Sequence, residues 1–133
     1  MFVSGNDIYI GGVSADNRAV YWKNGVAAYM QSSISGSYIT NVRSIFVSGN
    51  DVYATGNLIV PTNGGSNAPA YWKNGVEIDL PLNGAKYGNT ASIFVSGSDV
   101  YVAGSTTDGA VYWKNGIESV LSSQGDANYI IVQ

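Results

Sequence analysis

The sequence predicts an all-β fold built from three copies of one four-stranded unit, and three observations support this prediction. The string Tyr-Trp-Lys-Asn-Gly occurs three times, at Tyr21, Tyr71 and Tyr112. The string Phe-Val-Ser-Gly-(Asn/Ser)-Asp-(Ile/Val)-Tyr alternates with it and begins at Phe2, Phe46 and Phe94. The 133 residues include 17 glycines but only 3 prolines, and short apolar runs lie between the glycines, which is typical of strands joined by tight turns. Repetition at a regular period therefore determines the architecture.

The second unit shows the expected order of strands most clearly. Its first strand is Ser44–Ser48, and a tight turn at residues 49–51 leads to a second strand, Val52–Thr55, which we expect to end at Gly56. A variable loop follows. The third strand is Ala70–Lys73, and Asn74-Gly75 forms a two-residue hairpin turn to the fourth strand, Val76–Leu80. A polar connection through residues 86–91 then leads to the third unit.

The other two units repeat this order. The first unit is expected at Phe2–Ser4, Asp7–Ile10, Ala19–Lys23 and Val26–Met30. The third is expected at Ser92–Ser96, Asp99–Ala103, Ala110–Lys114 and Ile117–Leu121. Runs such as Ile-Phe-Val and Val-Tyr-Val-Ala are apolar on both faces, as strands buried on both sides are. Four-stranded antiparallel sheets stacked face to face around an axis explain this pattern, and that architecture is a β-propeller with one blade per repeat.

The repeat resembles the blades of bacterial β-propeller proteins whose units carry a Ser-Ile-Phe-Val-Ser-Gly-x-Asp-Val-Tyr hairpin and a Tyr-Trp-Lys-Asn-Gly hairpin. The resemblance covers nearly the whole chain and implies a fold rather than a biochemical role. The residues themselves do not indicate a location, and an extracellular or periplasmic one is suggested by the resemblance only. The sequence lacks the Trp-Asp pair of WD repeats and the Asp-rich calcium loops of integrin-type blades. Lectin propellers are similar in size, but this chain has no sugar-site motif to carry over.

We expect a single repeat domain over residues 1–133, with blade 1 at about 1–35, blade 2 at about 43–84 and blade 3 at about 91–125. Propellers typically have four to eight blades, so three blades leave two apolar faces open. Ser92 follows Trp72 by 20 residues and Gln133 follows Trp113 by 20, so Gln133 of one chain leads in phase to Met1 of another. The prediction is a head-to-tail homodimer that closes as a six-bladed ring, in which the tail 126–133 docks on the next chain. A nine-bladed homotrimer is the alternative, and a fragment of a longer propeller would show the same phase.

Composition excludes several functions. The net charge of −3 opposes binding to nucleic acid. The sequence contains no run of 18 apolar residues, so it predicts no membrane span. Cysteine and histidine are both absent, so acid–base catalysis would need a carboxylate pair, a lysine or a tyrosine. Glu77 and Asp79 lie on an expected outer strand, where such a pair usually is a solvated edge. Only one carboxylate recurs per repeat, which is too few for a metal site. We expect no enzyme activity, no metal and no cofactor.

The candidate ligand-binding residues lie in the loops between the second and third strands, because these loops differ most in length. They are Asp16, Asn17, Arg18, Asn63, Asn67, Thr107 and Asp108. The alternative is that these loops are solvated connectors. The repeated tryptophans, Trp22, Trp72 and Trp113, are expected to pack between blades rather than to stack on sugars. The repeated acids, Asp7, Asp51 and Asp99, are expected to bond turn amides.

Three functional hypotheses follow. The first is a non-catalytic scaffold or binding module that assembles with copies of itself, with a glycan or a protein as its ligand. The second is a carbohydrate-binding, lectin-like propeller that uses loop polar groups with Tyr or Trp. The third, a hydrolase, lacks the usual acid–base residues.

Overall fold

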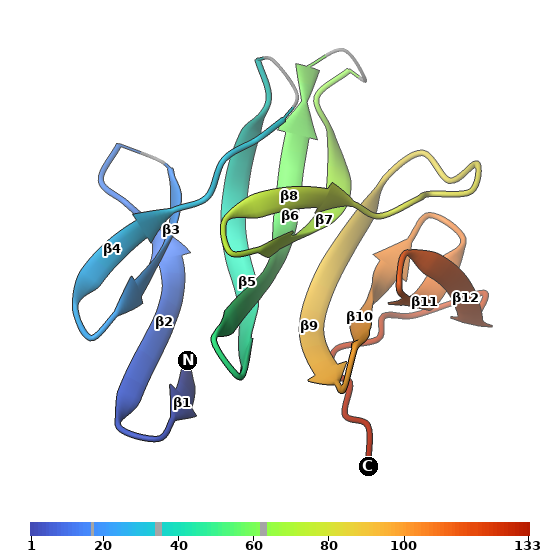
Figure 1. Ribbon diagram of the computed structural model, residues 1–133. Coiled ribbons are helices and arrows are strands. Elements are labelled where there is room, and N and C mark those ends of the chain that lie inside the picture. The colour runs from blue at the N-terminus through green and yellow to red at the C-terminus, as the bar shows by residue number, and fades with distance from the viewer. Residues whose placement is uncertain (17, 34–35, 62–63) are drawn as a thin grey trace.

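The computed structural model describes residues 1–16, 18–33, 36–61 and 64–133, so Asn17 and Asn63 lie outside the described residues. The described chain forms three four-stranded antiparallel sheets, each with its strands in sequence order (Figure 1). The prediction of an all-β fold with repeated four-stranded sheets is confirmed.

The strands of each sheet follow one another along the chain. The first sheet contains β1 (Phe2–Ser4), β2 (Asp7–Val13), β3 (Ala19–Lys23) and β4 (Val26–Tyr29). The second contains β5 (Tyr38–Ser48), β6 (Asp51–Val60), β7 (Ser66–Lys73) and β8 (Val76–Asp79). The third contains β9 (Gly88–Ser96), β10 (Asp99–Thr106), β11 (Gly109–Lys114) and β12 (Ile117–Ser122).

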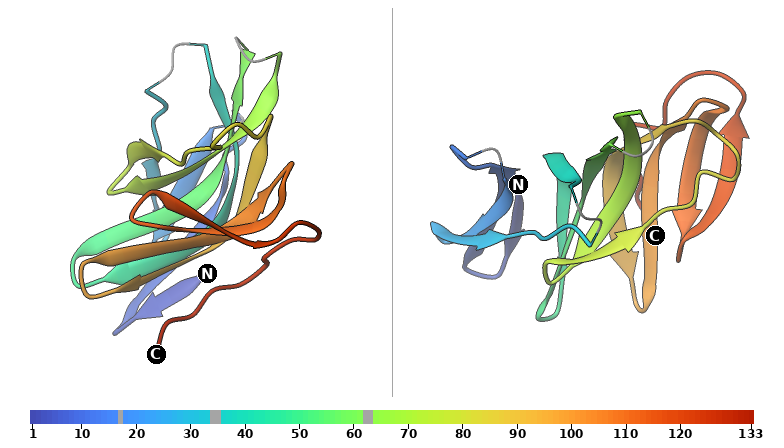
Figure 2. Two further views of the ribbon diagram at one scale, coloured as in Figure 1. Left: turned by 90° about the vertical axis from the view of Figure 1, so that its right-hand side faces the viewer. Right: turned by 90° about the horizontal axis from the view of Figure 1, so that it is seen from above.

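The three sheets stand side by side, with β5 packed between strands of the first sheet and β9 of the third (Figure 2). Two apolar clusters fill the spaces between them, one between the first and second sheets and one between the second and third. This arrangement fits a propeller-like fold, in which the faces of successive sheets are buried against each other.

An Asn-Gly turn joins the last two strands of every sheet, as the sequence predicts. The asparagines, Asn24, Asn74 and Asn115, all have positive φ angles, near 50°. In the second sheet Asn74 Oδ1 accepts a hydrogen bond from the amide of Val52 at 2.9 Å, and Asn74 Nδ2 donates to Asp51 at 2.8 Å. The turn therefore fastens the second hairpin of the sheet to the first. The other two sheets repeat both contacts.

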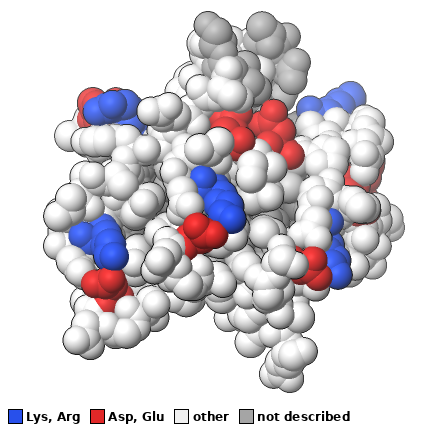
Figure 3. Space-filling model, in the orientation of Figure 1, with Lys and Arg blue, Asp and Glu red and all other residues white. Residues whose placement is uncertain are grey.

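The repeated aspartates have side-chain partners rather than the turn amides that the sequence predicted. Asp51 accepts from Lys73 at 2.8 Å as well as from Asn74, and both contacts lower the pKa of its carboxyl, with the lysine as the larger cause. The lysine ammonium also lies 5.4 Å from the centre of the Tyr53 ring. Equivalent ion pairs in the other sheets join Asp7 to Lys23 and Asp99 to Lys114. Figure 3 shows adjacent basic and acidic atoms on a surface that is otherwise mostly uncharged.

Most strands of the second and third sheets are longer than predicted, as is β2 (Asp7–Val13) of the first. Gly56 was expected to end its strand, and Asn57 to Pro69 to form a loop, but β6 runs on to Val60 and pairs with β7 from Ser66. The glycine serves a different purpose, because a Cβ at this position would collide with the carbonyl oxygen of Asn41 on β5. A register shift between β5 and β6 occurs at this point, so the glycine permits a bulge rather than a stop.

Candidate assembly interface

Each sheet has two faces, and residues at equivalent repeat positions form the same face in every sheet. We call the forward face the one turned towards the next sheet along the chain, and the backward face the one turned towards the preceding sheet. The forward face of the second sheet carries Tyr53, Tyr71 and Leu80. The backward face of the third sheet carries Val95, Val100 and Trp113. These residues are buried together in one apolar cluster, so this interface is built from two aromatic rings and a leucine against aliphatic side chains and an indole.

The interface between the first and second sheets uses the same positions. The forward face of the first sheet carries Tyr9, Tyr21 and Met30. The backward face of the second carries Val47, Val52 and Trp72. Among these six positions only Leu80 is replaced, by Met30, which fills a similar volume. One recognition pattern is therefore used twice within the chain.

A hydrogen bond from each buried tryptophan fixes how neighbouring sheets meet. Trp72 Nε1 donates to the carbonyl of Gln31, and Trp113 Nε1 donates to the carbonyl of Pro81, both at 2.9 Å. Each carbonyl directly follows the methionine or leucine of the forward face. The two indoles are at most 1% exposed, so their rings cannot stack on a ligand from solution. They act as anchors between sheets.

The phenylalanines of the innermost strands continue the pattern. The ring centres of Phe2 and Phe46 are 4.8 Å apart, and those of Phe46 and Phe94 are also 4.8 Å apart. The rings are tilted by 52° and 53°, within the range that aromatic pairs favour. The row runs across all three sheets at constant spacing.

The same positions are open at the two ends of the chain's stack of sheets. On the backward face of the first sheet Val3 is 55% exposed, whereas Val47 and Val95 at the same repeat position are 7% and 5% exposed. On the forward face of the third sheet Leu121 is 59% exposed, whereas Leu80 is 4% exposed. Ile8 and Ile10 are exposed beside Val3, Trp22 is half-buried, and Tyr101 and Tyr112 are half-buried near Leu121. Positions that are buried between sheets within the chain are therefore exposed on its two end faces.

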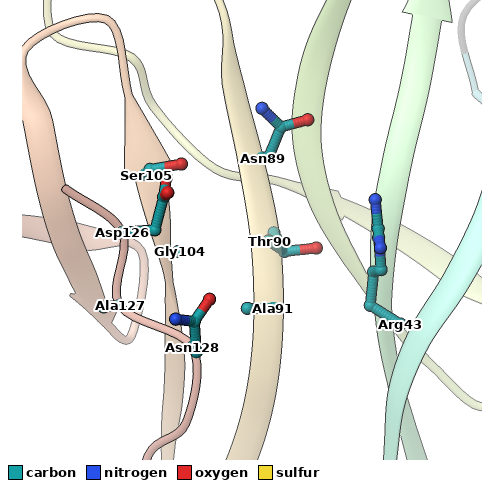
Figure 4. A pocket seen from close by; sticks show the side chains of 9 residues that line it. All are labelled: Arg43, Asn89, Thr90, Ala91, Gly104, Ser105, Asp126, Ala127 and Asn128. Carbon is teal, nitrogen blue, oxygen red and sulfur yellow. The ribbon is translucent and has the colours of Figure 1, made fainter.

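The tail after β12 lies along the open forward face of the third sheet. Ala127 donates its amide hydrogen to the carbonyl of Gly104 at 3.2 Å. A cleft of about 330 Å³ lies beside this contact, between the tail at Asp126–Asn128 and Arg43 on β5 (Figure 4). Further along, the tail covers the third sheet loosely, because Tyr129 and Ile131 stay 74% and 55% exposed.

The candidate ligand-binding residues that the structure describes do not gather at one place. Asp16 and Arg18 form an ion pair, with Arg18 Nε 2.6 Å from Asp16 Oδ2, and both line a cleft of about 480 Å³ with Tyr38. The Arg18 guanidinium lies 4.0 Å from the centre of the Tyr29 ring. Neither aromatic residue had been singled out from the sequence, because both lie outside the repeated strings.

The other described candidates make structural contacts on other sheets. Asn67 on β7 donates to Asn89 Oδ1 at 2.9 Å and so links the second sheet to the third. The Thr107 hydroxyl accepts from the amide of Lys86, and the Asp108 amide donates to the hydroxyl of Thr106. These contacts shape the β10–β11 turn and its neighbour, rather than lining the cleft of Asp16 and Arg18.

The carboxylates of the outer strands include one close pair, Glu77 and Asp79 on β8. Glu77 accepts from the amide and hydroxyl of Ser33, at 3.2 and 2.7 Å, and so ties β8 to the segment after the first sheet. Burial, and secondly Glu77, raises the pKa of Asp79. Burial is also the main cause that raises the pKa of Glu118. Within the part of the chain that the structure describes, no three acidic residues come together as metal ligands, and no helix has the length and apolar character needed to cross a bilayer.

Comparison with known proteins found no matching family model, no matching curated protein and no matching solved structure. The class therefore rests on the architecture itself. The chain is an all-β repeat protein of three four-stranded antiparallel sheets in a propeller-like arrangement.

Proposed function

We propose that this chain is a non-catalytic scaffold that assembles head to tail into a closed β-propeller, with the forward face of its third sheet packed on the backward face of the first sheet of another copy. One observation carries the proposal. Repeat positions that are buried between sheets within the chain are exposed on its two end faces, as Val3 and Leu121 show. A contiguous apolar face that is exposed on a folded chain usually marks an interaction site.

The two end faces also match in polar detail. Ser122 directly follows Leu121, as Pro81 follows Leu80, so the repeat assigns its carbonyl as the acceptor for the Trp22 indole of the second copy. Among the described residues, none within the chain accepts from the Trp22 indole. Phe94 is the last of the aromatic row and would continue it to Phe2 of that copy. The junction between chains thus repeats the junction between sheets.

A dimer is the favoured assembly, because two chains give six blades, within the usual range of four to eight, and three chains give nine. A two-fold ring contains two identical junctions, and it leaves no apolar face open. The clefts and loops of each chain then become pairs of potential binding sites on a rigid ring.

The test is absolute mass in solution, measured by light scattering behind a sizing column across a dilution series. We expect two chains for the natural sequence and one chain for Val3→Asp, because a charge placed in the junction would have to be buried unpaired. Val76→Asp is the matched control, since Val76 is 67% exposed on β8 of the middle sheet and should not change the mass. A natural chain that stays monomeric would refute the proposal, and a mass of three chains would indicate nine blades.

A second candidate function, glycan binding, has one specific observation in its favour. The cleft of Asp16 and Arg18 combines an ion pair with the ring of Tyr38, which is 56% exposed. An exposed ring beside charged hydrogen-bonding groups suits a sugar, which has apolar C–H faces and hydroxyl edges. Binding in a glycan array that is lost in Tyr38→Ala, with assembly unchanged, would support this candidate. Binding that survives both Tyr38→Ala and Arg18→Ala would exclude this cleft.

A further inference from the structure

One edge of the first sheet is left without a strand. β1 has 3 residues, whereas β5 has 11 and β9 has 9. As a result, residues 10–13 of β2 pair with β3 on one side but with no described strand on the other. In the third sheet the same stretch of β10 pairs with β9 as far as Asn89. A strand edge of this kind presents unpaired backbone donors and acceptors, which are a template for another strand.

The tail has the complementary property. Residues 129–133 read Tyr-Ile-Ile-Val-Gln, which is rich in β-forming side chains, and they pair with no strand in the described chain. One hydrogen bond of the tail shows which strand position it takes on the third sheet. Ala127 donates to the carbonyl of Gly104. At the same repeat position one sheet earlier, the carbonyl of Gly56 accepts from the hydroxyl of Thr90, which belongs to β9 of the following sheet. The tail therefore occupies the position of the innermost strand of a following sheet.

We propose that Tyr129–Gln133 adds to the free edge of β2 in a second copy of this chain and completes the first sheet of that copy in trans. This inference rests on the proposed head-to-tail assembly and names the segment that joins the two copies by backbone hydrogen bonds. These backbone hydrogen bonds would add to the apolar contacts of the junction. The added strand would also bury tail residues that are exposed in the single chain.

The repeat predicts the register of the added strand. Ile130 follows Trp113 by 17 residues, as Asn89 follows Trp72, and Asn89 pairs with Ser105 on β10. Val13 follows Phe2 by 11 residues, as Ser105 follows Phe94. Ile130 of one copy should therefore lie opposite Val13 of the other, in an antiparallel pair.

This register requires the tail to slide along the third sheet. In the single chain Ala127 reaches the carbonyl of Gly104, whereas the repeat assigns that place to Ile131, four residues later. The link that precedes the tail, residues 122–128, has the same length as residues 81–87, which lead from the second sheet to the start of β9. The link is therefore long enough to hold the new register.

Cysteine cross-linking tests the proposal, because the chain has no cysteine of its own. Equal amounts of Val13→Cys and Ile130→Cys chains are mixed, oxidised and run on a non-reducing gel. Each chain then carries one thiol, so every covalent product joins two copies. We expect at least tenfold more linked product from the mixture than from either variant alone, because the two positions face each other at Cβ distances that a disulfide can span.

A register control uses Asp126→Cys in place of Ile130→Cys. If the tail kept the register of the single chain, Asp126 would lie opposite Val13, and that mixture would give the linked product instead. That result, or a stable two-chain mass without any link from Ile130→Cys, would overturn the strand addition while leaving the head-to-tail assembly intact. A one-chain mass for the natural sequence would overturn both.

Discussion

Truncation of Leu121 gives a quantitative test of the open forward face. Leu121 is 59% exposed in the single chain, and its repeat equivalent Leu80 is 4% exposed once a following sheet covers it. Docking of a second copy should therefore bury about half of one leucine side chain. Complete burial of a leucine contributes about 1.5–3 kcal/mol, so Leu121 should contribute about 1 kcal/mol per junction.

A closed two-fold ring contains this junction twice. Leu121→Ala should therefore cost about 2 kcal/mol of assembly free energy, which raises the dimer dissociation constant about thirtyfold. The assay is light scattering or analytical ultracentrifugation across a dilution series. The chain's own stability should hardly change, because Leu121 makes few buried contacts in the single chain.

Leu80→Ala is the matched control, with the same chemical change at the same repeat position. Because Leu80 is buried inside the chain, this variant should lose about 2–5 kcal/mol of folding stability in chemical denaturation. If Leu121→Ala lowers folding stability as much as Leu80→Ala and leaves the dissociation constant unchanged, the two faces are not halves of one interface.

Three further outcomes follow from contacts within the chain. Trp72→Phe removes the hydrogen bond from the buried indole to the carbonyl of Gln31 and should cost about 1–3 kcal/mol of unfolding free energy, and an unchanged denaturation midpoint would contradict the anchoring role. Gly56→Ala places a methyl group against the carbonyl of Asn41, and this clash should outweigh the roughly 0.5–1 kcal/mol by which alanine usually stabilises a strand relative to glycine, so the thermal midpoint should fall; a stabilised variant would exclude the bulge. The folded-state pKa of Asp51 is lowered from 3.8, so its contribution is present above that pH and lost as the pH falls through the folded pKa. Asp51→Asn should therefore flatten the decline in stability below about pH 4, and an acid limb identical to that of the natural chain would exclude this role.

The repeated strings were sufficient to predict the number of sheets and their strand order. The Asn-Gly turns were also predictable, because the turn geometry demands positive φ at the asparagine. The extent of β6 was not predictable, because glycine at position 56 is equally consistent with a strand end and with a bulge. Only the position of Asn41 on the neighbouring strand decides between them.

The candidate site was less accessible to sequence reasoning. Loop length variation led to Asp16 and Arg18 but not to Tyr38, which comes from another sheet and reaches their cleft only through the packing of the two sheets. The open faces could have been located by aligning the repeats, since Val3 and Leu121 keep the residue types that are buried elsewhere. Their exposure depends on which sheets are neighbours, and this follows from the topology of the folded chain.

The constant spacing of the phenylalanine row has a consequence for how copies of this chain behave at high concentration. A subunit with one forward and one backward face has polarity, and polar subunits grow into open filaments unless their curvature brings the first and last faces together. In the proposed head-to-tail assembly, the rotation between adjacent sheets, which the tryptophan anchors fix, would therefore decide between a closed ring and a growing fibre. Substitutions that alter this rotation, without weakening the faces themselves, would change the product from one to the other.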